Sequence, residues 1–465
     1  MAAPSSRWPS HVTIWRWHFY AGLFCLPFVL WLSLTGSIYL FRPQVEALID
    51  RPFARIVAAD APRRTAAEQV AAAQAAVPGS TLHRYQLPDT ATQAVQVIVG
   101  RGGKEWRVYV DPATLAVLKT VGEEDRLMRI VFRLHGELLA GNPGSYLVEL
   151  AASWTIVMIL TGLALWLPRG GGMAGVVYPR LTAGGRRFWR DVHGVTGFWV
   201  SAMALALLVS GLPWAKSWGT YLKTVRSVVE GGPAKQDWPI GHDGGQIAGP
   251  APSASADAGT RAMADEHAEH GGMAMSHPAT DDRPLDRLVA TIRPLRLAAP
   301  VLIAPPTGPG EPWTAKSDAA NRPLRTDLTL DGATGRVLTR KDFATRRVMD
   351  RLVGYGVALH EGQLFGWLNQ LVNLLTALGL MLLSVSSIVL WWRRRPPGRL
   401  GAPRGQATRG ATAGATVLIG TVAILLPLFG LSLVLVLAIE RLLLRRWPAA
   451  RTWLGLGRSE APASA

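Results

Sequence analysis

Five long apolar runs constrain the fold of this chain more than any other feature of its sequence. Each holds about the 20 apolar residues that a helix needs to cross the hydrocarbon core of a bilayer. Most are interrupted only by Gly, Ser, Thr, Pro or Asn, which membrane-spanning helices tolerate. Only 17% of the 465 residues are charged, below the roughly 25% of an average soluble domain. The runs are Phe19–Phe41, Leu147–Leu167, Thr196–Trp214, Leu368–Trp392 and Ala415–Ile439.

The placement of charge predicts the orientation of these spans. The net charge is +17, yet the positive residues gather in short loops between apolar runs. Residues 168–191 carry five arginines against one acid, and residues 393–409 carry six arginines and no acid. The positive-inside rule places such loops in the cytoplasm. We therefore expect a multi-pass membrane protein with a cytoplasmic N-terminus and large external loops, and no nucleic-acid partner.

The two ends of the chain raise separate questions. The first run is too long for a cleaved signal peptide and lacks a small-residue cleavage site, so it is interpreted as a retained anchor. Five spans would place the C-terminus outside, but the basic stretch "ERLLLRRW" after the fifth run argues against this. Either that run is re-entrant or the charge rule is overridden there.

The two long external loops contain small α+β modules. The first begins with a helical pattern, "TAAEQVAAAQAAVPG", followed by the strand-like runs "AVQVIVG" and "EWRVYVDPATLAVLKTV". The second ends with "LRTDLTLDGATGRVLTR", in which a Gly-containing turn joins two strands. Residues 231–282 are rich in Gly, Ala, Pro, Ser, His and Met, and this composition predicts a disordered insertion.

The chain repeats itself. His135 precedes Trp166 by 31 residues, and His360 precedes Trp391 by the same interval. His18 and His193 each have a glycine four residues later. At offsets of 17 and 18 residues, His18 is followed by Thr35-Gly36 and His193 by Ser210-Gly211. This register predicts a tandem duplication of a span, an external module and a second span. The expected fold is a mainly α membrane protein with a four-helix bundle, a fifth C-terminal helix and α+β modules in the two external loops.

The predicted segments follow from this duplication. The first copy comprises 1–41 with the first span, 42–130 with the first module, and 131–168 with an outer histidine and the second span, followed by a basic loop at 169–190. The second copy comprises 191–214 with the third span, 215–350 with the insertion and the second module, and 351–392 with an outer histidine and the fourth span, followed by a basic loop at 393–411. The fifth span is expected at 412–440 and a tail at 441–465.

Four histidines occupy matching positions in the repeats. His18 and His193 begin outward-running spans and belong near the cytoplasmic face, whereas His135 and His360 precede inward-running spans and belong near the external face. Paired imidazoles from facing helices suit six-coordinate haem iron in electron transfer. The pattern predicts two bis-histidine haem b groups, one on each side of the membrane. Arg16 and Arg190 precede the inner pair and are either propionate partners or ordinary positive-inside charge.

Several of these motifs together resemble the PepSY-associated transmembrane family of bacterial inner-membrane proteins. They are "RWHFYAGLF", "YVDPATL", "DVHGVTGFW" and "LHEGQLFG", and the resemblance covers roughly residues 10–395. Members are often linked to iron acquisition, and some resemble di-haem reductases of ferric siderophores. The resemblance implies that His18, His135, His193 and His360 are the haem ligands. The Gly/His/Met insertion and the residues beyond about 410 depart from the pattern.

The insertion contains a separate metal-binding pattern. Imidazole and thioether groups suit copper, especially Cu(I), although a solvated linker also accounts for the composition. The candidate ligands are His267, His270, Met273, Met275 and His277, with Met263 nearby.

The sequence therefore predicts an oxidoreductase that carries electrons outward to a ferric siderophore, or to a ferric or cupric ion. No dinucleotide-binding or Walker A pattern is apparent, so the donor is either membrane quinol or a separate cytoplasmic reductant. The alternative is a non-enzymatic membrane-anchored protein whose external modules bind metal or regulate a protease. Metal transport is a third possibility, but the spans carry few polar residues to line a path.

Overall fold

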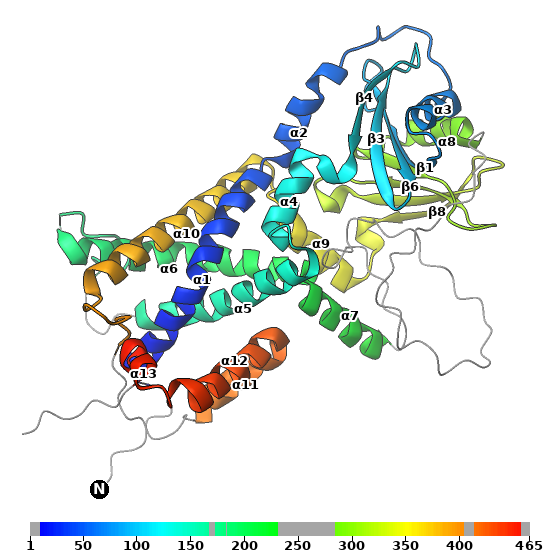
Figure 1. The fold of residues 1–465 in the computed structure, drawn as a ribbon. Helices are drawn as coiled ribbons and strands as arrows, with labels where there is room; N and C mark the ends of the chain where they lie inside the picture. The colour runs from blue at the N-terminus through cyan, green and yellow to red at the C-terminus, as the bar shows by residue number, and fades with distance from the viewer. Residues whose placement is uncertain (1–9, 167–172, 183, 231–283, 404–412, 457–465) are drawn as a thin grey trace, which may run out of the picture. The chain divides into compact units, whose positions relative to one another are not determined.

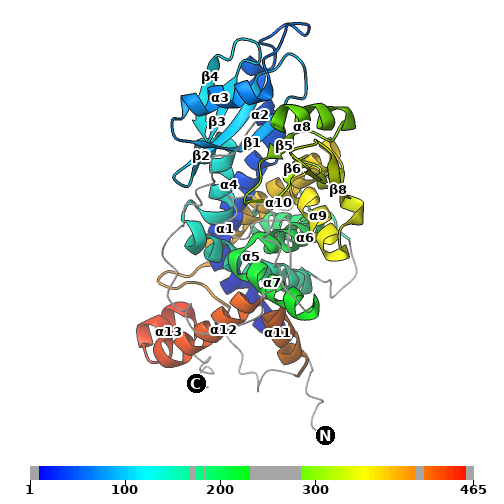
Figure 2. The ribbon, with the colours of Figure 1, turned by 90° about the vertical axis from the view of Figure 1, so that its right-hand side faces the viewer.

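The structure is a computed structural model that describes residues 10–166, 173–182, 184–230, 284–403 and 413–456. The chain divides into two compact units (Figures 1 and 2). The helical unit comprises Met1–Leu40, Phe132–Gly245 and Phe365–Ala465. The sheet unit comprises Phe41–Val131 and Gln246–Leu364, so each unit is assembled from segments far apart in the sequence. The predicted insertion 231–282 lies outside the described residues.

Five helices among the described residues are long and apolar enough to cross a membrane, which confirms a multi-pass membrane protein. Four of them are α1, α5, α6 and α10, and α6 is extended by the turn Leu212–Trp214. α1 packs on α5 and α10, and α6 packs on the same two helices. The duplication behind this arrangement stays a prediction. Their bounds are His11–Tyr39 (α1), Gly141–Trp166 (α5), Gly185–Gly211 (α6) and Trp367–Arg394 (α10).

The fifth apolar run is broken, contrary to the expected single span over 412–440. α11 (Ala413–Leu425) and α12 (Pro427–Ile439) are separated by Leu426, whose φ of −126° and ψ of 79° lie outside the helical region. Proline disfavours helical backbone at the residue before it and is suited to the first helical turn. The two helices pack against each other, and a Cβ on Gly430 would lie 3.0 Å from that of Ala423. The fifth candidate span is accordingly placed at Pro427–Leu444.

This helical hairpin starts and ends at the same end of the bundle. The Arg16 guanidinium, near the start of α1, donates to the carbonyl of Pro403 at 2.5 Å, before the hairpin. It also donates to the carbonyl of Gly455 at 3.2 Å, after α13 (Pro448–Leu454). With 13 residues, α11 is about 20 Å long, short of the roughly 30 Å hydrocarbon core, whereas α12 continues through Glu440–Leu444 and forms the 18-residue candidate span. The re-entrant alternative for this run stays a prediction.

A buried carboxylate anchors the helix that follows α6. Glu149 of α5 is 2% exposed, and its Oε2 accepts hydrogen bonds from the backbone amides of Ser217 at 2.9 Å and Trp218 at 3.1 Å. The Ser145 hydroxyl accepts from the Lys216 amide at 3.2 Å. These are the first amides of α7 (Lys216–Glu230), which have no partners within their own helix. Glu149 therefore caps α7 and complements the positive end of its dipole.

Replacing Glu149 with Ala should release the start of α7. Buried amides left without an acceptor cost about 1–3 kcal/mol. Hydrogen exchange of α7 amides, measured by mass spectrometry on the protein in nanodiscs, should then accelerate by about 5- to 100-fold. Glu149→Gln keeps an acceptor oxygen and should retain most of the protection. Equal exchange in wild type and Glu149→Ala would contradict the capping role.

The sheet unit contains one antiparallel sheet of eight strands, in the order β4-β3-β2-β1-β5-β6-β7-β8. Its two halves are the predicted modules, each formed by four consecutive strands and one preceding helix. The first half contains α3 (Ala66–Ala76), β1 (Thr81–Leu87), β2 (Val95–Arg101), β3 (Lys104–Val110) and β4 (Val117–Gly122). The second contains α8 (Pro284–Ile292), β5 (Val301–Ala304), β6 (Trp313–Ser317), β7 (Thr326–Leu330) and β8 (Val337–Asp342). The remaining helices of the unit are α2 (Arg42–Asp50) and α9 (Val348–His360), and the unit boundary falls within α4 (Leu127–Glu137).

The two modules are joined rather than separate. β1 pairs with β5 through Tyr85 opposite Ile303 and Leu87 opposite Val301. α3 and α8 contact each other, and side chains from both modules form one apolar core. The sequence predicted two related modules, and the structure adds that they share a sheet and a core.

The last hairpins of the two modules use the same turn. In the first, Asp111 Oδ1 accepts from the amides of Ala113 and Thr114, at 2.8 and 3.1 Å. In the second, Asp331 Oδ1 accepts from the amides two and three residues later, at 2.8 and 3.4 Å. Leu115 and Gly335 follow at equivalent positions with φ of 64° and 73°. This correspondence supports a common origin of the modules.

An ion pair lies within the first module. Arg107 Nε on β3 donates to Glu123 Oε1 at 2.6 Å, and its Nη1 donates to Gln96 Oε1 at 2.6 Å. The two charged side chains are only 13% and 19% exposed. Burial alone would raise the pKa of the Glu123 carboxyl, but the charges and hydrogen bonds of Arg107, together with Arg126 and Arg84, lower it to about 2. The carboxylate is therefore ionised at any physiological pH.

Candidate functional site

His18 on α1 is held by two oxygens of α5. Its Nδ1 lies 2.9 Å from the carbonyl oxygen of Met158 and 3.2 Å from Thr161 Oγ1. A carbonyl only accepts hydrogen bonds, so Nδ1 carries the proton. The Thr161 hydroxyl donates to the carbonyls of Val157 and Met158 and is therefore also an acceptor for His18. In the neutral imidazole the lone pair is then on Nε2, which is the atom that binds a metal.

His193 on α6 is held in the same way by α10. Its Nδ1 lies 3.0 Å from Ser386 Oγ, and the backbone of Leu383 is a further hydrogen-bond partner. Ser386 donates its own proton to the Leu383 carbonyl at 3.0 Å, so its oxygen accepts from His193. Leu383 stands three residues before Ser386, as Met158 stands three residues before Thr161. The same local arrangement thus fixes both imidazoles.

The structure brings His18 and His193 together, as the sequence predicted for the inner pair. Their ring centroids are 6.5 Å apart and their planes are inclined by 81°. Two imidazoles bound end-on to one metal, with metal–nitrogen bonds of about 2 Å, place their ring centroids roughly 6 Å apart. The separation and the donor atoms fit a bis-histidine iron site. The hydrogen bonds at Nδ1 are the outer contacts that orient such ligands.

His135 near the end of α4 has an equivalent partner on α1. Its Nδ1 lies 3.1 Å from Thr35 Oγ1, and the Thr35 hydroxyl donates to the carbonyl of Trp31 at 2.9 Å. His135 Nδ1 is therefore also a donor, and the lone pair of the neutral imidazole is on Nε2. Thr35 and Thr161 are each followed by a glycine, and each Thr-Gly pair contacts one histidine. Thr35 of α1 thus positions a histidine of α4, and Thr161 of α5 positions a histidine of α1.

A glycine lies close beside each of these two histidines, where a side chain would crowd the imidazole. A Cβ on Gly162 would lie 3.0 Å from His18 Cε1, and a Cβ on Gly36 would lie 3.0 Å from His135 Cε1. Gly22 and Gly197, which follow the inner histidines by four residues, are less crowded. A Cβ there would meet Met158 Sδ at 3.7 Å and Leu383 Cδ2 at 3.6 Å, which is ordinary contact.

His360 is the last residue of α9 and belongs to the sheet unit. His135 belongs to the helical unit, and their pairing as an outer site stays a prediction. The sequence register supports it. Thr161 follows His135 by 26 residues, and Ser386 follows His360 by the same interval. The residues that hold the inner histidines therefore stand at equal distances from the two outer ones.

The two arginines proposed as propionate partners have protein partners in the structure. Arg16 donates to the carbonyls of Pro403 and Gly455, and Arg190 Nη2 lies 3.2 Å from Asp191 Oδ1. Asp191 is 1% exposed and is also bound by Arg180, at 2.6 and 2.9 Å. These contacts organise the basic end of the bundle.

The expected copper-binding residues belong to the insertion. The copper-binding candidates His267, His270, Met273, Met275 and His277 lie outside the described residues. Within the described ranges, no group of three or more His, Cys, Asp or Glu side chains is arranged to hold a metal ion. The residues that sequence reasoning missed are Thr161, Ser386 and Thr35. Their signal was the constant spacing from the histidines, but a hydroxyl in a membrane helix ordinarily bonds its own backbone.

Comparison with known proteins adds one match. A family model described as the PepSY-associated TM region matches residues 15–394. No curated protein matches the chain. The matched region includes all four registered histidines and both modules of the sheet.

Proposed function

Because the chain belongs to the PepSY-associated TM family, we propose that it is a di-haem b-type transmembrane reductase. It moves electrons from the cytoplasmic side of the bacterial inner membrane to the periplasm. There it reduces a ferric siderophore, or a ferric or cupric ion, for metal acquisition. The observation that carries the proposal is the inner histidine pair, in which both Nδ1 atoms are hydrogen-bonded and the ring centroids are 6.5 Å apart.

The roles of the chain's own residues follow from these contacts. His18 and His193 hold the inner haem, and His135 and His360 hold the outer haem. Met158, Thr161 and Ser386 orient the inner ligands by accepting hydrogen bonds from the Nδ1–H groups. Haem iron with two imidazole ligands supplies one-electron transfer without an open coordination position. One electron converts one ferric ion to ferrous, and the softer ion binds hard oxygen donors less tightly, which favours release from a siderophore.

The proposal is tested by haem content and electron transfer on the purified protein. Preparations from haem-replete cells should show a b-type reduced-minus-oxidised spectrum with two haems per chain. The dithionite-reduced protein, freed of excess reductant, should then be mixed with ferric siderophore or Cu(II) in a stopped-flow instrument. The acceptor that reoxidises the protein identifies the substrate class. A colourless preparation would contradict the proposal and favour the non-enzymatic alternative.

Ser386 gives a sharper prediction for the inner site. Ser386→Ala removes the hydroxyl that accepts a hydrogen bond from His193 Nδ1. Without this hydrogen bond the imidazole is a weaker donor to iron. Loss of such a partner typically costs about 10- to 100-fold in metal affinity or activity. Haem retention should fall, and the midpoint potential of one haem should rise because the ferric state loses more stabilisation than the ferrous state.

Ser387→Ala is the matched control for this measurement. The Ser387 hydroxyl bonds the carbonyl of Ser384 within α10 and makes no contact with His193 among its described hydrogen bonds. A redox titration should leave its two potentials unchanged. Identical titrations of Ser386→Ala and Ser387→Ala would show that the His193 hydrogen bond has no influence on the site.

One observation favours the binding alternative. Of the two outer strands of the sheet, β8 is exposed at five of its six residues and β4 at three of six. Exposed strand edges are able to pair with an added peptide strand. A protein that lacks haem but captures a peptide at these edges would have the non-enzymatic function.

A further inference from the structure

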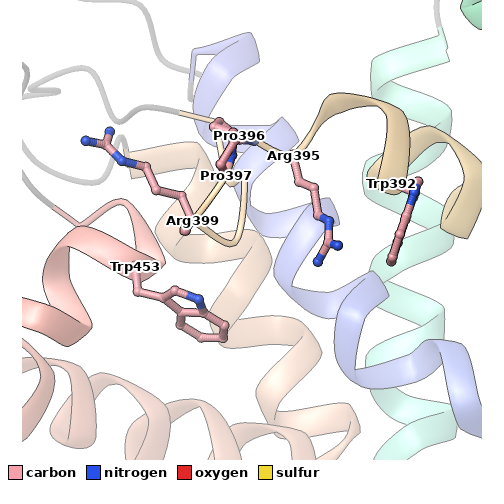
Figure 3. Close-up of a pocket in the computed structure, with 7 residues that line it drawn as sticks. Trp392, Arg395, Pro396, Pro397, Arg399 and Trp453 are labelled. Carbon is pink, nitrogen blue, oxygen red and sulfur yellow. The ribbon is translucent and has the colours of Figure 1, made fainter.

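A cavity of about 400 Å³ lies beyond the C-terminal end of α10 (Figure 3). It is lined by Trp392, Arg395, Pro396, Pro397, Gly398, Arg399 and Trp453. All of these belong to the helical unit, and none takes part in the histidine sites. The cavity is large enough for the polar head of a small amphiphile, since ligand pockets occupy roughly 300–1,000 Å³.

The walls of the cavity are held together by backbone contacts. The amide of Leu400 donates to the carbonyl of Trp453 at 2.9 Å, which joins the loop after α10 to α13. The Trp391 indole donates to the carbonyl of Leu400 at 2.9 Å. Gly398 and Gly401 have φ of 68° and 81°, which shapes the loop that carries the two prolines. The cavity is therefore preformed by two segments distant in sequence.

The charged residues that line the cavity are both arginines. Arg393, Arg394, Arg395 and Arg399 occur within seven residues that include no acid. Within the part of the chain that the structure describes, neither Arg395 nor Arg399 forms an ion pair with a carboxylate. The Arg395 guanidinium lies over the Trp392 ring, 4.0 Å from its centroid, and its hydrogen-bonding edge remains available. Figure 3 shows Arg395 beside the cavity and Arg399 at its rim, with its guanidinium directed outward.

The position of the cavity indicates which class of ligand it binds. It follows directly after a membrane-spanning helix, at the level where the hydrocarbon core gives way to lipid headgroups. Trp392 and Trp453 are 62% and 50% exposed, as expected of indoles in that interfacial layer. Basic pockets on the cytoplasmic side of spanning helices bind the phosphates of anionic lipids. A planar guanidinium matches phosphate with two parallel hydrogen bonds.

We propose that this cavity binds the phosphate headgroup of an anionic phospholipid, with Arg395 contacting the phosphate, Arg399 adding positive charge at the rim, and Trp392 and Trp453 flanking the glycerol region. Such a lipid joins the end of α10 to α13. Neither haem binding nor reductase activity is required for lipid binding. A failure of the proposed function would therefore leave the lipid site unaffected.

Native mass spectrometry of the full-length protein tests the site. Delipidated protein is titrated with phosphatidylglycerol and, separately, with phosphatidylcholine of the same chain length. One tightly bound phosphatidylglycerol is expected, with no equivalent phosphatidylcholine. The double variant Arg395→Gln/Arg399→Gln should bind this lipid about 30-fold more weakly, since each arginine near an anionic headgroup contributes about 1 kcal/mol.

Arg441→Gln/Arg446→Gln is the matched control, because it removes two positive charges from the same C-terminal segment outside the cavity. It should retain the bound lipid. Equal losses in both double variants would show a general charge effect and overturn the proposal. Displacement of the lipid by millimolar inorganic phosphate would assign the site to free anions and overturn it as well. Size-exclusion profiles identical to wild type establish that the variants are folded, and Arg395→Lys/Arg399→Lys, which keeps the charge, should restore part of the affinity.

Discussion

Replacing His193 with Ala is expected to leave one haem per chain, where the proposed function requires two in the wild type. The remaining imidazole of His18 provides a single ligand, and the six-coordinate iron that the pair would hold is no longer formed. Electron transfer to an external ferric acceptor should then fall to the background rate, because the inner end of the path is missing. The pyridine haemochrome assay measures the haem content, and stopped-flow reoxidation measures the transfer.

Pairwise variants distinguish a shared site from two separate effects. His18→Ala, His193→Ala and the double variant should all lose the same single haem, because residues acting on one site are not additive. His193→Ala combined with His135→Ala should lose both haems. His83→Ala is the control, since His83 lies on β1 and bonds Glu105 in the sheet unit at 2.8 Å. Two haems in His193→Ala would contradict the assignment of the inner site.

Replacing Arg107 with Ala should lower the stability of the first module of the sheet. The change leaves the buried Glu123 carboxylate without its main partner, which typically costs about 3–5 kcal/mol. Hydrogen exchange of β2, β3 and β4 amides should accelerate by about two to three orders of magnitude. Arg340→Ala is the control, because the Arg340–Asp342 pair is 50% and 45% exposed and such pairs contribute about 0–1 kcal/mol. Similar exchange in both variants would contradict a stabilising role for the buried pair.

The same pair predicts how stability changes with pH. The pKa of Glu123 is lowered from 4.5 to about 2 in the folded protein, so its contribution is complete above pH 4.5. The contribution is lost as the pH falls from 4.5 towards 2, and it corresponds to about 3 kcal/mol. Acid unfolding followed through the tryptophan fluorescence of the module should therefore begin at a higher pH in Arg107→Ala than in wild type.

The spans and the candidate ligands were predictable because they depend on local composition and on a register that the sequence repeats. The fifth run was not predictable from its apolar content. Pro27 lies inside the continuous helix α1, whereas Pro427 coincides with a break. The difference comes from tertiary contacts. The Trp218 indole donates to the carbonyl of Leu425 at 2.9 Å, and Leu426 and Phe429 pack with Leu212.

The pairing of the two modules through β1 and β5 could not be predicted from the sequence either. β1 reads "TLHRYQL", in which polar and apolar residues alternate imperfectly, because the register shifts between Leu82 and Arg84. A strand of this kind gives a weak periodic signal. The hydroxyl partners of the histidines were missed for another reason. Thr161 and Ser386 have the constant spacing, but only the packing of α1 on α5 and of α6 on α10 shows which histidine each one reaches.

The pairing of β1 with β5 has a consequence for synthesis. β1 ends at Leu87 and β5 begins at Val301, so its partner strand emerges roughly 200 residues later. At about 5–20 residues per second, the first module waits about 10 to 40 s with one edge unpaired. An unpaired edge is the usual starting point for aggregation. We therefore expect the nascent chain to be most prone to aggregation during this interval, before β5 covers the free edge of β1.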